Sequence, residues 1–204
     1  QGKTNILEAV YLAGTTKSHR GTKDRDMISF GEEESHIEVK VLKNGVPFRI
    51  DIHLKKNSPK GAAINRMPVK RASELFGIIN LVFFSPEDLN IIKNGPAQRR
   101  RFMDLELSQL DKIYLNNLAD YNRVVNQRNR LLKEMAFQEK LKDTLEIWDM
   151  QLVRYGERVM EGRKKFLREI NEIVGDIHGK LTGGRERLVM EYEPSTGELS
   201  LEEA

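Results

Sequence analysis

The chain has 204 residues, a length that fits one or two domains. Charged residues make up 32% of it, and no apolar run approaches the roughly 18–20 residues needed to cross a bilayer, so we expect no contact with a membrane. Cysteine is absent, which excludes a disulfide scaffold, a thiolate zinc site and a cysteine nucleophile. The same absence suits a reducing, cytoplasmic compartment.

Positive charge is concentrated in the middle of the chain. Residues 93–142 carry 11 Lys and Arg against 6 Asp and Glu, net +5, whereas the whole chain has a net charge of +3. Within that segment Arg123, Arg130 and Lys133 recur at helical spacing and fall on one stripe of a helix. The stripe is a candidate contact for the phosphates of DNA, and a merely solvated helix face is the alternative.

The chain opens on what matches the second half of a phosphate-binding loop. Gly2, Lys3 and Thr4 precede an apolar, helix-like run, as in the motif G-x-x-x-x-G-K-[ST], so we expect the sequence to begin inside that motif. Glycine lets the backbone approach phosphate oxygens, and the helix N-terminus and the lysine both attract anions. The Thr4 hydroxyl is a candidate Mg²⁺ ligand. The alternative is a chance tripeptide at the start of a helix.

Residues 36–84 predict a small sheet and a buried strand. Hydrophobic alternation over 36–42 and 48–54 flanks Asn44-Gly45, a strong hairpin signal. A short strand is expected at 62–65. Residues 15–26 predict a surface loop, 71–77 predict a short helix closed by glycine, and the apolar run 78–84 predicts a buried strand.

The second half of the chain predicts helices. Residues 85–88 have a helix-start pattern, 94–96 predict a turn, and the period is helical from there to 180, which indicates three or four helices in an antiparallel bundle. Three consecutive arginines at 99–101 step by ~100° each, so at least one is expected to contact a neighbour. Residues 188–192 predict a strand and 194–197 a turn.

Several blocks in this order resemble the RecF family of bacterial recombination-repair ATPases, relatives of SMC and Rad50. The blocks lie at 2–11, 17–20, 84–89, 94–104, 126–133 and 148–152. The resemblance implies a P-loop, ABC-type ATPase lobe of the α+β or α/β class, a mixed sheet with a hairpin, and an inserted helical-bundle arm. It places the lobe at 1–92, the arm at 93–180 and a returning strand and turn at 181–204. It also implies that the N-terminal strands, Walker B and the signature motif lie outside this sequence. The L-T-G-G-R run at 181–185 is similar to a signature motif, but a hairpin turn is expected there.

The resemblance also implies a function. Such a protein is an ATP-dependent, nucleoid-associated DNA clamp of recombinational repair, replication restart and the SOS response. It is implied to bind ATP with Mg²⁺, to form an ATP-dependent homodimer at double-stranded DNA and ds/ss junctions, and to act with RecR and RecO in loading RecA. Weak DNA-dependent ATPase activity is expected at full length, with no catalytic residue in this segment and no hydrolysis by it alone.

The candidate site residues follow from the same resemblance. The ATP contacts would be Gln1, Gly2, Lys3, Thr4, Asn5, Arg20 and Glu87, with Thr4 also near Mg²⁺. DNA would meet the arm stripe, or instead a surface of the lobe, in which case the arm would bind RecR. The lobe surface comprises Lys17, Arg20, Lys55 and Lys56.

Two other functions stay open. One is a nucleotide-independent structural or partner-binding module with a vestigial loop. The other is a different SMC-like or Rad50-like ATPase, although such proteins need long coiled coils around a hinge or a zinc hook. The four histidines share no metal-ligand spacing, and Trp148 with Tyr155 is expected in the bundle core.

Overall fold

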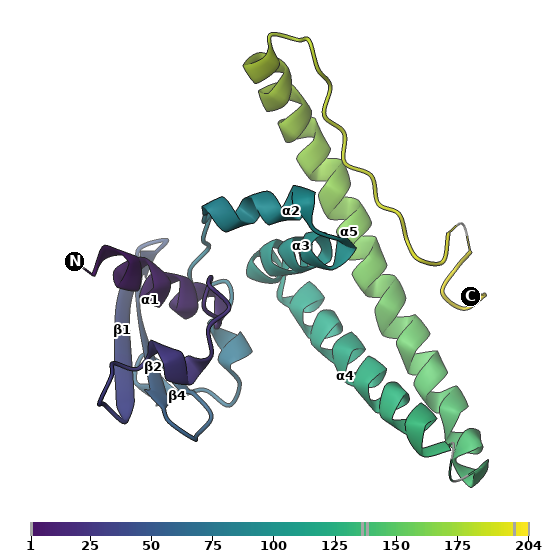
Figure 1. The fold of residues 1–204 in the computed structure, drawn as a ribbon, viewed down its shortest axis with the longest axis horizontal. Helices are drawn as coiled ribbons and strands as arrows, with labels where there is room; N and C mark the ends of the chain where they lie inside the picture. The colour runs from purple at the N-terminus through teal and green to yellow at the C-terminus, as the bar shows by residue number, and fades with distance from the viewer. Residues whose placement is uncertain (1, 136, 138, 198, 204) are drawn as a thin grey trace. The chain divides into compact units, whose positions relative to one another are not determined.

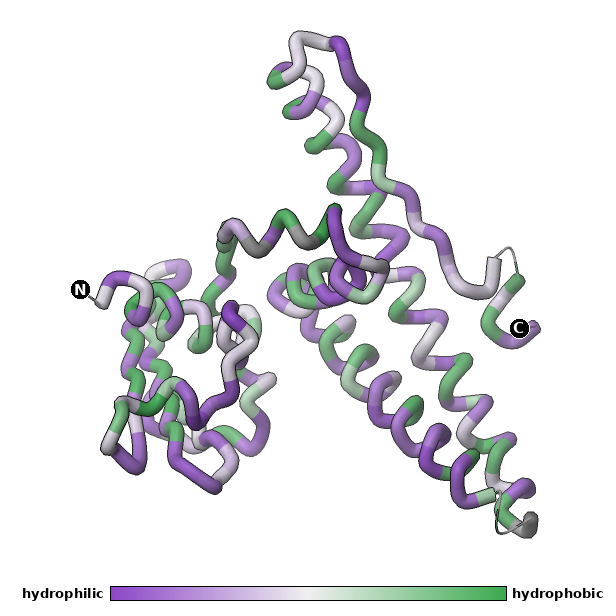
Figure 2. Tube along the Cα trace, viewed as in Figure 1, coloured by the Kyte–Doolittle hydropathy of each residue, from purple (hydrophilic) through white to green (hydrophobic). Residues whose placement is uncertain are grey.

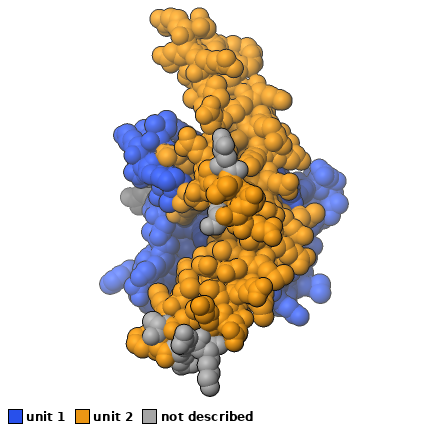
Figure 3. Space-filling view, turned by 90° about the vertical axis from the view of Figure 1, so that its right-hand side faces the viewer, with its two compact units in different colours: residues 1–98, 108–112 blue, residues 99–107, 113–204 orange. Residues whose placement is uncertain are grey.

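The computed structural model describes residues 2–135, 137, 139–197 and 199–203, without the side chains of residues 87, 90, 139 and 140. The chain divides into two compact units, coloured separately in Figure 3. Unit 1 comprises residues 1–98 and 108–112, and unit 2 comprises residues 99–107 and 113–204. In the described part of the chain, no helix combines the length and the apolar character needed to span a membrane.

Unit 1 is a small sheet with helices, which confirms the α+β class. The strands are β1 (Glu34–Lys43), β2 (Val46–Lys55), β3 (Gly61–Ile64) and β4 (Met67–Pro68), in that spatial order and antiparallel throughout. The helices are α1 (Lys3–Thr15) and α2 (Asn90–Lys93), with 3₁₀ turns at Asp24–Met27, Ala72–Leu75 and Pro86–Leu89.

The hairpin between β1 and β2 forms as its sequence predicts. Lys43 pairs with Val46, and between them Asn44 and Gly45 both have positive φ, 51° and 78°. Two left-handed residues are what a tight two-residue hairpin turn requires, and asparagine and glycine adopt that conformation most readily. The resulting register places the alternating apolar residues of both strands on one face of the sheet.

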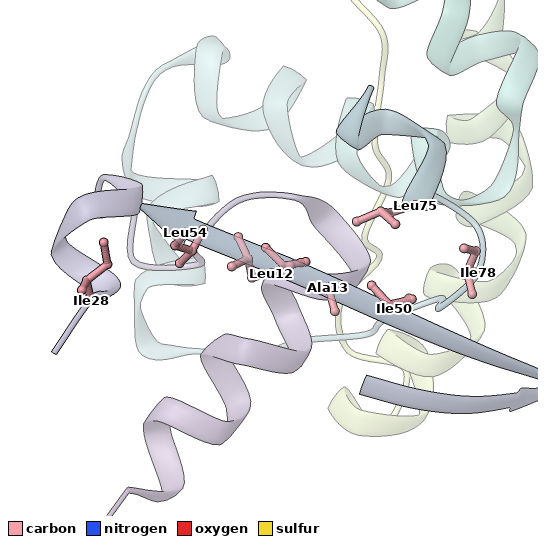
Figure 4. Close-up of a cluster of buried hydrophobic side chains, with 8 residues drawn as sticks. Leu12, Ala13, Ile28, Ile50, Leu54, Leu75 and Ile78 are labelled. Atoms are coloured by element: carbon pink, nitrogen blue, oxygen red, sulfur yellow. The ribbon is translucent and has the colours of Figure 1, made fainter. Parts of the chain in front are cut away.

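The core of unit 1 lies between that face and the last turns of α1. Leu12 and Ala13 are fully buried there, with Ile50 and Leu54 of β2 (Figure 4). The apolar run at 5–12 is typical of a helix buried under a sheet, but Ile6 is 66% exposed. Only the C-terminal half of α1 therefore packs on the sheet, which leaves its N-terminal half accessible.

The strand predicted at 78–84 is not formed. Val82 and Phe84 are exposed, and the backbone of Leu81 pairs instead with one side chain: its N–H donates to Gln109 Oε1 (2.7 Å), and its carbonyl accepts from Gln109 Nε2 (3.3 Å). A β-rich composition does not suffice, because a strand needs a neighbouring backbone to complete its ladder.

Helices dominate unit 2, as predicted. α3 (Pro96–Leu110) contributes its middle to unit 2 and its ends to unit 1, and the long helices are α4 (Lys112–Met135) and α5 (Leu145–Thr182), with a 3₁₀ segment at Glu139–Thr144. Figure 1 shows α4 and α5 side by side, and Figure 2 shows the alternation of apolar and polar positions along both. Their direction is antiparallel, since Tyr114 and Tyr121 of α4 lie against Gly162 and Gly156 of α5, in reverse order.

The three arginines at 99–101 are all exposed at the start of α3. Two details of unit 2 differ from the predictions. Residues 188–192 form no strand; the Asn171 side chain instead bonds both the N–H and the carbonyl of Met190 (2.8 and 2.7 Å). The glycines at 183–184 end α5 as a C-cap, with φ of 63° at Gly183, and do not make a hairpin turn.

We expect two glycines of α5 to respond oppositely to substitution by alanine. A Cβ at Gly162 would lie 2.5 Å from the Tyr114 ring, so Gly162→Ala should lower the free energy of unfolding by about 1–3 kcal/mol through overpacking. A Cβ at Gly179 would have nothing within 4 Å, so Gly179→Ala should raise the free energy of unfolding by about 0.5–1 kcal/mol. Urea denaturation followed by helical circular dichroism measures both, and equal shifts would contradict the packing described here.

Candidate nucleotide-binding site

The start of α1 offers free anion-binding groups. Gly2 occupies the N-cap with φ of 91°, a left-handed conformation that suits glycine, and its carbonyl accepts a hydrogen bond from the Ile6 N–H (3.1 Å). The first turn, all of it described, has no side-chain cap and no acidic residue. Its N–H groups therefore face outward with the positive end of the helix dipole, beside exposed Lys3 and Thr4.

The loop after α1 is held by one carboxylate. Glu8 Oε1 accepts hydrogen bonds from the hydroxyls of Ser18 (2.5 Å) and Thr22 (3.3 Å), and Oε2 lies 3.9 Å from the Arg20 guanidinium. The Glu8 side chain is only 13% exposed. The Ser18 hydroxyl also accepts from the Arg20 backbone N–H (3.1 Å), so the loop and α1 are joined through a short chain of polar contacts.

Aromatic packing fixes the same loop from the other side. The rings of His19, Tyr11 of α1 and Phe83 contact one another. Their centroids are 5.6 Å apart for Tyr11 and His19, 4.6 Å for His19 and Phe83, and 5.2 Å for Tyr11 and Phe83, the last pair edge-on. Aromatic contacts of this kind stabilise a structure by more than the burial of their surface area alone. The loop is therefore attached to α1 at three successive residues, 18, 19 and 20.

The structure describes most of the predicted nucleotide contacts. Lys3, Thr4 and Asn5 share the exposed first turn, and Arg20 joins them through Glu8. Gln1 lies outside the described residues. Glu87 belongs to the 3₁₀ turn Pro86–Leu89, and its side chain is outside the described part of the structure.

Sequence reasoning missed Glu8. A signal was present, because residues at i and i+4 share a helix face and Glu8 follows Thr4 by four positions. Only the fold, however, brings the loop that carries Ser18 and Arg20 onto that face.

The predicted DNA-binding cations are spread over both units. In unit 1, Lys17 and Lys55 are exposed and Lys56 pairs with Glu33 (3.0 Å). In unit 2, two of the three arm-stripe cations have a carboxylate beside them on α4. Arg123 pairs with Asp120 (2.9 Å) and Arg130 with Glu134 (2.7 Å), which raises the pKa of Arg130 through that hydrogen bond. Lys133 is exposed.

A buried polar cluster joins the three helices of unit 2. Asp104 of α3 accepts hydrogen bonds from the Tyr114 hydroxyl (2.5 Å) and from the Arg163 guanidinium through Nε (2.9 Å) and one terminal nitrogen (2.8 Å). Burial, and then the bond to Asp104, raises the pKa of Tyr114. Burial alone would lower the pKa of Arg163, but its hydrogen bond to Asp104 raises it. The predicted core pair Trp148 and Tyr155 is half-buried.

The described residues contain no group of three or more His, Asp or Glu side chains arranged to hold a metal ion. A Mg²⁺ ion at this site would therefore depend on the Thr4 hydroxyl and on the oxygens of a bound nucleotide.

Comparison with known proteins gives the family. The DNA replication and repair protein RecF of Agathobacter rectalis is 63% identical over 203 residues, which are 100% of this chain and 56% of that protein. RecF of Lachnospira eligens is 62% identical over 205 residues, with the same shares. The chain belongs to the RecF family. It spans about half the length of the curated relatives it matches. No family model matches it.

Solved RecF structures share the fold. One, described as the recombination mediator protein RecF-ATP in the RecFOR pathway, is 32% identical with a TM-score of 0.88, over 99% of this chain and 56% of that chain. A second, RecF-ATPrS, is 33% identical with a TM-score of 0.83, over 90% and 50%. These matches confirm the mixed α+β fold that the sequence predicted.

Proposed function

We propose that this chain supplies the ATP-binding face and the arm of an ATP-dependent DNA clamp. In this proposal residues 1–92 belong to the ATPase lobe, 93–180 form the arm and 181–204 lead back toward the lobe. ATP and Mg²⁺ occupy the start of α1, two copies dimerise on double-stranded DNA at gaps, and RecR and RecO take part in loading RecA.

One observation carries the proposal. The uncapped, acid-free N-terminus of α1 presents Gly2, Lys3 and Thr4 with outward backbone donors, and this set of groups matches the needs of a triphosphate. The match to a structure described as RecF-ATP supports the same reading. The intact pair of Lys3 and Thr4 argues against a vestigial loop.

The arm stripe is the proposed contact for DNA. Arg123, Arg130 and Lys133 lie on α4, and the ion pairs of the first two are exposed. Exposed pairs contribute only about 0–1 kcal/mol, so a phosphate can replace either carboxylate. The contacts would be sequence-independent, because phosphates carry no base information.

We expect the salt dependence of DNA affinity to report these contacts. In the protein at the full length of its relatives, replacing all three arm cations by alanine should flatten the slope of log K against log salt by about 2–3 units, since each phosphate contact contributes about −0.9. The slope is measured by fluorescence anisotropy of binding to gapped duplex DNA in the presence of ATP, at salt concentrations from about 50 to about 300 mM.

Two matched variants test the same surface. Asp120→Asn and Glu134→Gln remove the neighbouring carboxylates and should strengthen binding, because they unpair Arg123 and Arg130. Replacing Lys17, Lys55 and Lys56 by alanine serves as the lobe control. An unchanged slope for the arm variant with a flatter slope for the lobe variant would assign DNA to the lobe and make the arm stripe only a solvated helix face. Equal affinity in ATP and ADP would contradict the clamp itself.

A further inference from the structure

Glu8 has an unexpected position for an acidic residue. It lies one turn after Thr4 on the same face of α1, on the helix whose start is the proposed phosphate site. A carboxylate there repels a triphosphate unless its charge is compensated. The structure supplies the compensation through Arg20 and through two hydroxyl donors.

The contacts of Glu8 differ in strength. The Ser18 hydroxyl donates to the carboxylate and Ser18 is only 3% exposed, so water does not compete with this contact and it is firm. The Arg20 pair is long, 3.9 Å, and the Arg20 side chain is 46% exposed, so this contact is weak. The loop backbone is thus fixed to Glu8, while the guanidinium remains free to exchange partners.

We propose that Glu8 is a positioning residue that anchors the 17–22 loop and holds Arg20 ready for the outermost phosphate of ATP. The inference rests on the proposed nucleotide function. When ATP binds, Arg20 exchanges the Glu8 carboxylate for phosphate oxygens, and the hydroxyls of Ser18 and Thr22 keep Glu8 satisfied. Arginine suits this role, because its fork of donors matches phosphate geometry.

The choice of the outermost phosphate follows from placement. In a G-K-T loop the lysine reaches the β- and γ-phosphates and the threonine faces Mg²⁺. Arg20 lies beside Glu8, one turn after Thr4, on a loop separate from the G-K-T segment. We therefore assign it to the γ-phosphate, which lies beyond the α- and β-phosphates that the loop backbone cradles. Glu8 therefore contributes to the preference for ATP over ADP without touching the nucleotide.

The test compares ATP and ADP affinities in the protein at the full length of its relatives. Glu8→Ala should weaken ATP binding about 10-fold and ADP binding less than about 2-fold, since a charge-assisted contact is worth roughly 1.5–3 kcal/mol. Arg20→Ala should do the same. The double variant should be no weaker than Arg20→Ala alone, because the two residues act as one unit.

Two further variants separate anchoring from charge. Glu8→Gln keeps an oxygen acceptor for the hydroxyls and frees Arg20, so its ATP affinity should stay within about 3-fold of the unmodified protein. Ser18→Ala removes the firm contact without altering α1 and should lower ATP affinity in the direction of Glu8→Ala. Thermal melting of each variant accompanies the titrations, so that unfolding is recognised.

The outcomes distinguish this inference from the function on which it rests. If Lys3→Ala weakens ATP binding but Glu8→Ala and Ser18→Ala leave the ratio of ATP to ADP affinity unchanged, the role of Glu8 is overturned and the nucleotide site stands. Additive losses in the double variant also overturn it. If Lys3→Ala leaves ATP affinity unchanged, the nucleotide site itself is wrong.

Discussion

Asp104→Asn is expected to lower the free energy of unfolding of unit 2 by about 3 kcal/mol, because it breaks a largely buried ion pair and leaves the partner unsatisfied. The Asp104 and Arg163 side chains are only 19% and 10% exposed. An amide at position 104 keeps the shape but turns an N–H₂ toward the guanidinium or the Tyr114 hydroxyl, each of which needs an acceptor. The guanidinium then remains buried without its counter-charge.

Urea denaturation of the chain, followed by helical circular dichroism, measures this effect. Tyr114→Phe removes the hydroxyl that bonds Asp104 but keeps the Asp104–Arg163 ion pair, and should cost about 1 kcal/mol. Glu169→Gln is the matched control: its pair with Lys165 on α5 is exposed, so the change should stay within about 0.5 kcal/mol. An effect of Asp104→Asn no larger than that of Glu169→Gln would show that the cluster does not hold the three helices together.

Lys3→Ala, in the protein at the full length of its relatives, should weaken ATP binding about 10- to 100-fold, since a hydrogen bond to a charged group contributes roughly 1.5–3 kcal/mol. ATP-dependent dimerisation should disappear with it. The fold should be unaffected, because Lys3 is exposed in the first turn of α1 and alanine favours a helix.

Calorimetric titration gives the affinity, and light scattering with and without ATP gives the change in mass. Lys40→Ala is the control, an exposed lysine of β1 whose side chain pairs with Glu38 (3.2 Å), and it should leave both measurements unchanged. A shift to dimer on adding ATP that persists in Lys3→Ala would contradict the proposed role of the loop.

Local sequence signals determined much of this fold. Asn44-Gly45 set the hairpin and its register, Pro96 marked the first residue of α3, and the helical period from there predicted an antiparallel pair of long helices. These features could be predicted because each depends on residues close in sequence: a left-handed turn, a fixed φ and a repeating apolar face. The start of α1 with Lys3 and Thr4 could be predicted for the same reason, since these residues are adjacent in the sequence.

Tertiary structure decided the features that depend on distant partners. The runs at 78–84 and 188–192 have strand-like composition, yet Leu81 and Met190 each pair with an amide side chain, of Gln109 and Asn171. Composition cannot supply the neighbouring backbone that a strand requires. The burial of α1 also depends on a distant partner, because only the part of the helix that meets the sheet is buried.

The residues of the candidate site also fall into two groups, those that the sequence predicts and those that only the fold brings together. The sequence by itself determined the phosphate-binding character of residues 2–4, because the motif is contiguous. Only the tertiary structure brought Arg20 and Ser18 to Glu8 and joined Asp104 to Arg163, pairs separated by 10 to 59 positions. A carboxylate in a helix carries no sign of its partner in the sequence, since the energy of the pair depends on distance and burial, and the fold alone sets both.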